Sequence, residues 1–138
     1  MEIETIFDVA RHAMSAQMVR LNTVSSNIAN AGSVSTTEEG AYQPMRPVFE
    51  TIYADQRGQS GLSTTRAREV VTLDRSPNRQ FRPDHPMADE EGYIFLPQVN
   101  PDEEMVEMLE ASRQYQNVLE TVSTMRTLMA RTVKMGQG

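Results

Sequence analysis

Apolar side chains recur at alternating spacings of four and three residues along the first part of the chain. The positions are Ile3, Phe7, Ala10, Met14, Gln17, Leu21, Val24, Ile28 and Ala31, of which only Gln17 is polar. This alternation extends over about four heptads and is typical of a helix that packs along its length against other helices. We therefore predict an N-terminal helix, with Thr5 and Asp8 as its N-cap pair and Gly32 as a left-handed cap at its end.

A second long helix is predicted at the other end of the chain. Asn100 is a favourable N-cap, Pro101 suits the first helical position, and Glu103 stands where a capping box has its acid. Neither glycine nor proline occurs from residue 102 to residue 135, which allows a rod of about 50 Å at 1.5 Å per residue. Its predicted seam consists of Met105, Met108, Ser112, Tyr115, Leu119, Val122, Met129 and Val133.

The residues between these helices have a different character. Residues 48–53, 69–74 and 93–96 are bounded by turn-forming residues and predict short strands. Residues 55–65, with the sequence DQRGQSGLSTT, predict a flexible loop. The sequence thus predicts a mainly α fold with a small β-containing insert, in which the long terminal helices pair as a coiled-coil-like bundle.

Three regions follow from this pattern: an N-terminal helix (1–32), an irregular β-containing insert that faces outward (33–99) and a C-terminal helix (100–138). Chain termini are usually the least ordered part of a domain, whereas here they carry the most regular sequence. We therefore expect the terminal helices to pack against each other or against neighbouring subunits.

Composition and charge narrow the classes of function. A formal charge of -6, from 13 basic and 19 acidic residues, argues against a nucleic-acid partner, because phosphate binding needs a basic surface. The ten methionines suit adaptable helix seams. Without cysteine there is no disulfide, thiolate metal site or cysteine nucleophile.

The hydropathy of the chain predicts no membrane span. Apolar runs stay far below the roughly 20 residues that cross a bilayer, so we do not expect an integral membrane protein. The N-terminal sequence MEIETIF is acidic, where a secretory signal begins with basic residues. If the protein leaves the cytoplasm, we expect this to happen without a cleaved signal peptide.

One cluster of potentially reactive side chains occurs, in the stretch PDHPMADEE. Its members are Asp84, His85, Asp89, Glu90 and Glu91. Pro83, Pro86 and Gly92 mark successive turns there, so we favour an exposed loop over a metal or general-base site. His12 has no second histidine at a ligand spacing, and GQSG at 58–61 lacks the glycine spacing of a serine nucleophile. The sequence predicts no enzyme and no cofactor.

Asparagine is a poor helix former, yet Asn27 and Asn30 stand in the last turns of the predicted N-terminal helix, in SSNIANAGS. A helix-ending role accounts for Asn30 but less well for Asn27, which lies more than a turn earlier. Spaced three apart beside Ile28, the two amides share one face of the helix. We expect them to bond a partner helix and so fix the register of packing.

The two ends of the chain together resemble the axial proteins of the bacterial flagellum, the rod, hook and hook-junction subunits. That family has an Asn-x-x-Asn motif at the end of the first helix and a Glu-Met-Val…Arg-x-Tyr motif in the last. The matching positions are Asn27, Asn30, Glu104, Met105, Val106, Arg113 and Tyr115. The connector HPMADEEGYIFLPQVN and the ending TVKMGQ are similar to those of proximal rod members.

The resemblance implies a structural subunit of the proximal rod of the flagellar basal body, which polymerises through its terminal helices and transmits torque across the periplasm. It implies export by the flagellar type III apparatus without a cleaved signal peptide. The implied partners are other copies of the chain, the proximal rod proteins FlgB and FlgF, the distal rod protein FlgG and the adaptor FliE. The alternative is a soluble helical-hairpin adaptor or regulator of flagellar export.

A set of assembly-interface residues follows from the two seams and the family motifs. The set is Phe7, Met14, Leu21, Val24, Asn27, Ile28, Asn30, Met105, Met108, Arg113, Tyr115, Leu119, Val122, Met129 and Val133. We expect both terminal helices to be partly disordered in the isolated chain and to order on assembly. We also expect Asn27→Ala to weaken polymerisation more than folding of the monomer.

Overall fold

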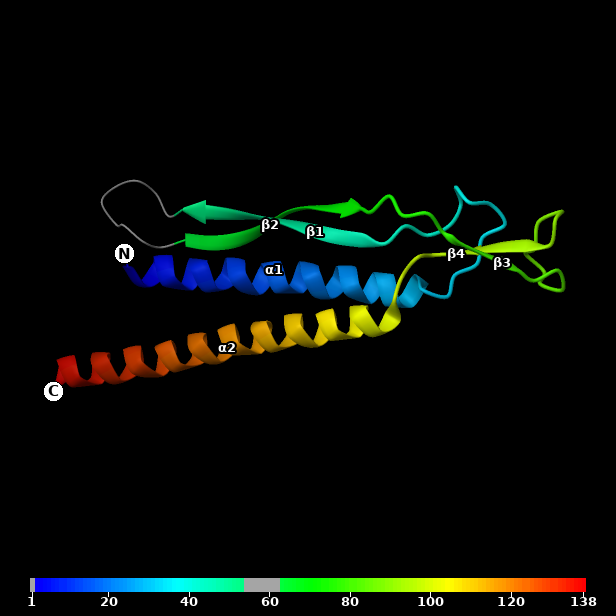
Figure 1. Ribbon diagram of the computed structural model, residues 1–138. Helices are drawn as coiled ribbons and strands as arrows, with labels where there is room; N and C mark the ends of the chain where they lie inside the picture. The colour runs from blue at the N-terminus through cyan, green and yellow to red at the C-terminus, as the bar shows by residue number, and fades with distance from the viewer. Residues whose placement is uncertain (1, 54–62) are drawn as a thin grey trace.

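The computed structural model describes residues 2–53 and 63–138, in which two long helices accompany two small antiparallel sheets (Figure 1). The helices are α1 (Glu2–Asn30) and α2 (Pro101–Gln137); the strands are β1 (Met45–Tyr53), β2 (Ser63–Thr72), β3 (Asn78–Phe81) and β4 (Tyr93–Leu96). The predicted fold class, mainly α with a small β part, is confirmed at this level.

The predicted start of α2 is also confirmed. The Asn100 side chain accepts a hydrogen bond from the backbone N–H of Asp102 at 3.1 Å, and Pro101 begins the helix. Acidic side chains occupy the first turn and Lys134 the last, so the charges complement the helix dipole. The cap and the dipole therefore act together to fix where α2 begins.

The ends of α1 differ from the prediction. The helix begins at Glu2, so Thr5 lies inside it and is not its cap, because nothing in the preceding residues breaks a helix. Gly32 does not have a positive φ. Instead, the backbone N–H and the hydroxyl of Ser33 donate to the carbonyl of Asn30, at 3.1 and 2.9 Å. Ser33 thus caps the carbonyl of the last helical residue, and the helix ends without a left-handed glycine.

Two antiparallel strand pairs make up the β part. Strands β1 and β2 pair from Met45↔Thr72 to Tyr53↔Ser63, with a bulge between Val48 and Phe49. Strands β3 and β4 pair from Asn78↔Leu96 to Phe81↔Tyr93. The strand at 93–96 has the predicted bounds. The predicted strand at 48–53 is part of the longer β1, whereas β2 begins before the predicted strand at 69–74 and ends at Thr72, two residues short of its predicted end.

The insert also shows what the hydrophobic pattern missed. Strand β3, with the sequence NRQF, is exposed at every position, so it has no alternation of buried and exposed residues to detect. The loop prediction for 55–65 falls largely outside the described residues, but Ser63–Thr65 belong to β2. Cross-strand hydrogen bonds to β1 override the turn-like composition of these three residues.

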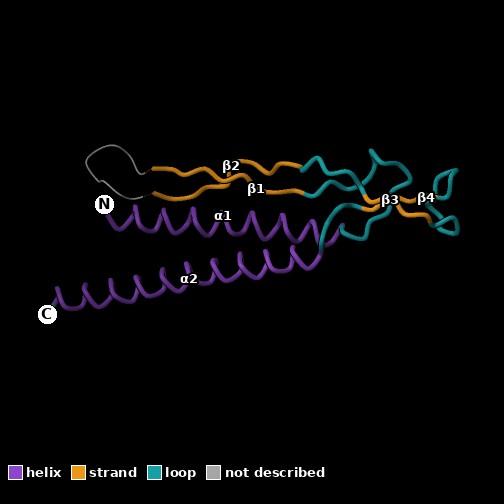
Figure 2. The backbone as a smooth tube through the Cα atoms, viewed as in Figure 1, coloured by secondary structure: helices purple, strands orange, loops and turns teal. Residues whose placement is uncertain are grey.

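Helix α1 is the middle layer of the molecule (Figure 2). The β1–β2 hairpin lies along one side of α1, and α2 runs antiparallel along another, while β3 and β4 lie beyond the ends of the helices that are joined to the insert. Both chain termini lie at the opposite end of the molecule. Among the side chains that the structure describes, the buried apolar residues besides Pro44 and Pro97 are few: Ala16, Val24, Ala41, Ile94 and Ala111. A core this small leaves polar contacts to specify how the layers are joined.

Asn27 is the central polar contact between the three layers, and it is 0 % exposed. Its side-chain oxygen accepts hydrogen bonds from the backbone N–H of Met45 at 2.8 Å and from the Tyr42 hydroxyl at 2.9 Å. Its side-chain nitrogen donates to the Met45 carbonyl at 2.9 Å and to Glu104 at 3.1 Å. The amide thus uses both donors and accepts twice, which joins α1 to β1 and to α2.

Glu104 extends this contact to an ion pair with the half-buried Arg46. The Glu104 residue is 2 % exposed, and both of its carboxylate oxygens accept hydrogen bonds from the guanidinium of Arg46. Arg46 also donates to the Met45 carbonyl at 3.0 Å. A buried carboxylate is tolerated only when it is paired and hydrogen-bonded. We call Asn27, Tyr42, Met45, Arg46 and Glu104 the polar centre.

Asn27→Ala removes a hydrogen-bond partner from the buried Glu104 carboxylate and from the half-buried Met45 N–H and Tyr42 hydroxyl. We expect the free energy of unfolding to fall by about 2–3 kcal/mol, measured by urea denaturation followed by circular dichroism. This replaces the expectation that Asn27 acts mainly in polymerisation.

The matched control is Asn22→Ala, at an exposed position of the same helix. Its free energy of unfolding should stay within about 0.5 kcal/mol of the unchanged protein. Equal losses for the two substitutions would show that the polar centre is not a special contact.

Candidate assembly interface

The burial pattern of α2 defines the face that packs on α1. Covered side chains recur at alternating spacings of four and three: Glu104, Met108, Ala111, Tyr115, Val118, Val122, Met125 and Met129. Ala111 is 0 % exposed, and Gln17 of α1 donates to Gln114 of α2 at 2.9 Å. This seam has the predicted alternation of four and three residues. It differs from the predicted seam by one residue at the positions where Ala111 stands in place of Ser112 and Val118 in place of Leu119.

The predicted interface residues of α1 are all at least partly covered within the single chain. Val24 and Asn27 are buried, and the other five are half-buried: Phe7, Met14, Leu21, Ile28 and Asn30. Asn27 does bond a second helix, but that helix is α2 of its own chain. Asn30 donates to the Ser26 carbonyl at 2.9 Å, a contact inside α1. The two amides therefore have separate roles.

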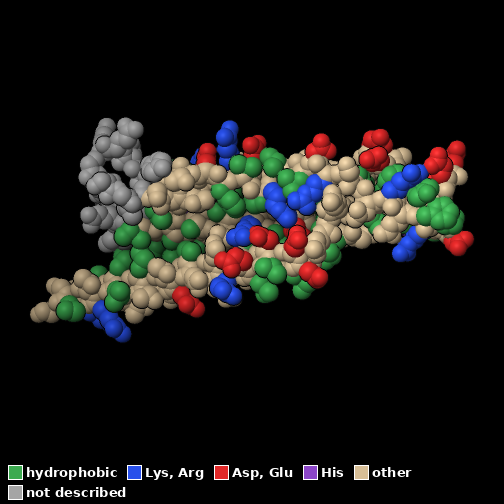
Figure 3. Space-filling view, in the orientation of Figure 1, with side chains coloured by type: hydrophobic (Ala, Val, Ile, Leu, Met, Phe, Trp, Pro, Cys, Tyr) green, Lys and Arg blue, Asp and Glu red, His purple; other side chains and the backbone are tan. Residues whose placement is uncertain are grey.

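The predicted interface residues of α2 divide into two groups. Met108, Tyr115, Val122 and Met129 are half-buried along the helix pair, whereas four others are exposed: Met105, Arg113, Leu119 and Val133. Other large apolar residues of α2 are exposed as well: Val106, Leu109, Leu128 and Met135. Hydrophobic patches along α2 are visible in Figure 3. Contiguous exposed apolar residues on a helix mark a surface for further packing.

Helix α2 also extends past the start of α1. The antiparallel pair has Gln17 opposite Gln114, and at equal rise per residue Glu2 then comes level with about Met129. Residues 130–137 lie beyond that level, and all of them are exposed. The C-terminus correspondingly lies farther out than the N-terminus in Figure 1. We call residues 130–137 the α2 overhang.

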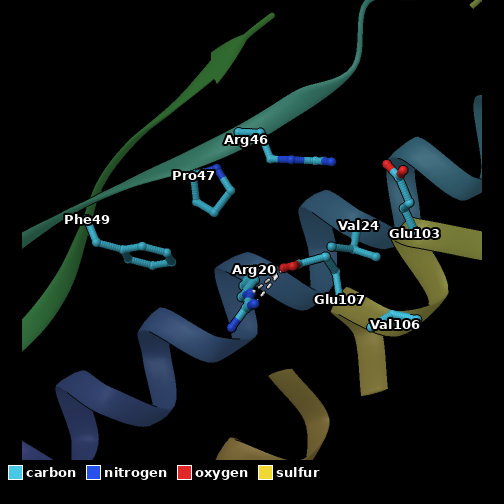
Figure 4. Close-up of a pocket in the computed structure, with 8 residues that line it drawn as sticks. All are labelled: Arg20, Val24, Arg46, Pro47, Phe49, Glu103, Val106 and Glu107. Carbon is cyan, nitrogen blue, oxygen red and sulfur yellow. Dashed lines mark hydrogen bonds and ion pairs between the residues drawn. The ribbon is translucent and has the colours of Figure 1, made fainter. Parts of the chain in front are cut away.

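A groove runs between the β1–β2 hairpin and α2, with α1 as its floor. One part has a volume of about 740 Å³ and is lined by Val24, Pro47, Val106 and charged side chains (Figure 4). A second part, of about 480 Å³, continues over Ala13 and Ala16. Arg20 and Phe49 line both parts, so the two parts adjoin each other. We call the two parts together the α1 groove.

Charged side chains line the wider part of the α1 groove. Arg20 donates to Glu107 through Nε at 3.0 Å and through a terminal nitrogen at 2.5 Å, and Figure 4 shows the two side chains directed at each other. Arg46 is paired with the buried Glu104. Glu103 adds another carboxylate to the lining. The lining of this part thus contains two arginines and two glutamates, and both arginines are already paired with carboxylates.

The acidic cluster in the connector forms the predicted turns. The N–H of Met87 donates to Nδ1 of His85 at 3.0 Å, and one Asp89 oxygen accepts from the N–H groups of Glu91 and Tyr93 at 3.0 and 2.8 Å. Over residues 2–53 and 63–138, no group of three or more acidic, histidine or cysteine side chains converges on a metal position. The acidic cluster therefore stabilises a loop. The GQSG stretch lies outside the described residues.

Sequence reasoning did not find several residues of this surface. Glu104 was identified from the family motif, but its pairing with Arg46 and Asn27 was not, because 58 and 77 residues separate it from these partners. The walls of the α1 groove come from three elements that are distant in the chain. No local pattern brings such residues together.

In the described part of the chain, neither helix has the length and hydropathy to span a membrane.

Two protein-family models match the two helical ends of the chain. The model of the flagella basal body rod protein family matches residues 7–34, and the model of the C-terminal region of flagellar basal body rod FlgEFG proteins matches residues 90–135. These ranges include Asn27 at the end of α1 and Glu104 at the start of α2, the two side chains that meet in the polar centre.

Full-length relatives share the whole chain. A flagellar basal-body rod protein FlgC of Yersinia enterocolitica is 39% identical over 138 residues, which cover 99% of this chain and 100% of the relative. The FlgC of Salmonella typhimurium is 34% identical over 137 residues (99% and 100%), and that of Aquifex aeolicus 32% over 133 residues (96% and 96%). With such identity over the full length, the chain belongs to the FlgC family of flagellar basal-body rod proteins.

Proposed function

We propose that the chain is a structural subunit of the proximal rod of the flagellar basal body, which polymerises through its terminal helices and transmits torque across the periplasm. Membership of a rod-protein family supports the structural role. The observation that carries the mechanism is the apolar surface of α2, which the single chain leaves exposed at Met105, Leu109 and Leu119. Burying such a surface against other subunits is favourable by about 25 cal/mol per Å² of apolar area.

The three regions take different parts in this proposal. The helical ends, 1–32 and 100–138, form a coiled-coil-like bundle with the helices of neighbouring subunits, and residues 33–99 form the outer layer. The polar centre supports torque transmission, because it joins α1, β1 and α2 through buried hydrogen bonds that resist sliding of one layer past another. Force applied to one layer is then shared by all three.

The neighbours follow from the same family role. They are other copies of this chain, the proximal rod proteins FlgB and FlgF, the distal rod protein FlgG and the adaptor FliE. The chain reaches its place through the flagellar type III export apparatus without a cleaved signal peptide. The role is structural and not enzymatic, without a nucleic-acid partner and without integration in the membrane. An export adaptor, the alternative, would be absent from purified basal bodies.

The exposed Leu119 tests assembly without disturbing the fold. Leu119 is 49% exposed in the single chain, and Leu119→Asp places a charge at this position. The free energy of unfolding should therefore change by less than about 0.5 kcal/mol. In the assembled rod the charge would be buried without a partner. We expect export to continue, incorporation into basal bodies to fail and motility to fall to background in swimming assays.

The control is Asn117→Asp, which introduces the same charge at an exposed polar position on another face of α2. Bacteria with this variant should swim normally. Normal swimming of the Leu119→Asp strain as well would remove this surface from the interface.

We expect the end of α2, more than α1, to become ordered on assembly. Helix α1 is already covered on two sides in the single chain. Backbone amides of residues 130–137 should exchange hydrogen rapidly in the monomer and become protected in isolated basal bodies, as followed by mass spectrometry. Amides around the buried Ala111 should be protected in both states. Strong protection of the overhang in the monomer would show that it orders without partners.

A further inference from the structure

The hairpin of β3 and β4 carries apolar side chains that its own fold leaves uncovered. Phe81 is 63% exposed, and Met87 in the loop between the strands is exposed as well. This hairpin lies at the end of the molecule opposite both chain termini, where hydrophobic side chains gather beside acidic ones (Figure 3). We call residues 78–96 the β tip. Exposed apolar side chains gathered at a protruding end are suited to a contact with another molecule.

The exposed aromatic side chain of the β tip is held in a defined position. The ring of Phe81 meets the ring of Tyr93 edge-on, with the ring centroids 5.1 Å apart. The guanidinium of Arg79 lies 3.7 Å from the centroid of the Tyr93 ring and bonds Glu91 at 2.6 Å. Gly92 has a φ of 85°, and a Cβ there would lie 2.9 Å from the Phe81 ring, so only glycine permits this approach. A side chain that is already ordered loses little entropy when a partner covers it.

The β tip also has an excess of negative charge. Residues 78–96 contain four carboxylates and two arginines. Glu91 is paired with Arg79. Asp84 and Glu90 are exposed, and among the described residues neither side chain makes an ion pair or a hydrogen bond. The tip thus combines an apolar surface with carboxylates that are free to meet cations from outside.

The α2 overhang, at the opposite end of the molecule, has the complementary properties. Arg131, Lys134 and Met135 are separated by three and four residues, so they share one face of the helix. Met135 is 82% exposed. No acidic residue occurs from residue 121 to residue 138, so the overhang is purely cationic. Its positive charge and its apolar side chain therefore match the carboxylates and the apolar side chains of the β tip.

We propose that the α2 overhang of one copy docks on the β tip of the next copy. The side chain of Met135 then covers Phe81, and the two cations of the overhang face Asp84 and Glu90. This inference rests on the proposed polymerisation and specifies two of the surfaces that meet in it.

The overhang cannot reach the β tip of its own chain. Helix α2 is continuous from Pro101 to Gln137 and begins four residues after the end of β4. From Pro101 to Met135 the helix spans about 50 Å at 1.5 Å per residue, and it leads away from the tip. The occupant of the tip must therefore come from another molecule.

The two surfaces have the geometry of an open polymer. They lie at opposite ends of an elongated molecule (Figure 1). A contact between two different patches is heterologous, so each added copy exposes a new overhang and a new tip. This contact therefore continues along an axis and does not close into a two-fold dimer.

Charge exchange tests the pairing of the two surfaces. Arg131→Glu with Lys134→Glu places like charges opposite each other. We expect this variant to be exported, but its amount in isolated basal bodies should fall at least about tenfold. Adding Asp84→Lys with Glu90→Lys exchanges the signs of both surfaces and should restore incorporation and swimming.

The control for the charge exchange is Arg68→Glu, at an exposed position of β2, which should leave incorporation unchanged. If the Arg131→Glu, Lys134→Glu variant is incorporated normally, the docking is wrong. A loss that the exchanged charges do not restore would also overturn it.

Crosslinking tests the contact directly, because the chain has no cysteine. In the double variant Met87→Cys with Met135→Cys, a short bismaleimide reagent should join copies within isolated basal bodies into dimers, trimers and longer ladders. Each single variant should remain monomeric. The matched control pairs Met135→Cys with Asn117→Cys, an exposed position in the middle of α2, and should give no ladder.

The outcomes separate this inference from the proposed function. If the double cysteine variant is present in basal bodies and the cells swim, but no ladder forms, the docking is wrong and the proposed function stands. Crosslinks from Met87→Cys to a different rod protein would assign the β tip to that protein and also overturn the docking. Absence of the unchanged chain from basal bodies would instead overturn the proposed function.

Discussion

The buried side-chain amide of Asn27 is the contact on which the arrangement of this protein depends. It bonds both the N–H and the carbonyl of Met45, as a neighbouring strand would, and it also bonds the carboxylate of Glu104. Helix, strand and second helix are therefore fixed at one point with little apolar core around it. Hydrogen bonds are directional, whereas apolar packing of small side chains permits sliding, so this point sets the register of the layers.

The polar centre also explains why α2 is left with so much exposed apolar surface. Glu104 faces inward to meet Asn27 and Arg46, and this rotation brings Ala111 and Val118 onto α1. Met105, Val106 and Leu109 are then turned away from the helix pair, at exposures of 55–67%. The two-helix contact and the exposed apolar surface, which we propose is the subunit interface, thus result from one rotation of α2.

The proposed transmission of torque requires resistance to force, and the layered arrangement suits that requirement. The hairpin is held to α1 by the polar centre near one end and by the Thr64 hydroxyl, which donates to the Val9 carbonyl at 3.2 Å, near the other. The α1 groove lies between these two attachments and the α2 wall. The end of α2 is exposed throughout residues 130–137, and in our proposal contacts with other subunits cover it.

Sequence by itself determined the two terminal helices, the cap at Asn100, the strand at 93–96, the structural class of function and the family, because these depend on local spacing, capping and short motifs. It did not determine which of two adjacent apolar stripes of α2 packs on α1, since Met105 and Leu119 are as apolar as Met108 and Val118. Nor did it show that Asn27 meets Glu104 across 77 residues, or that the exposed NRQF segment is a strand. Only the tertiary structure decided these, because each depends on a partner that the chain brings near from far away in sequence.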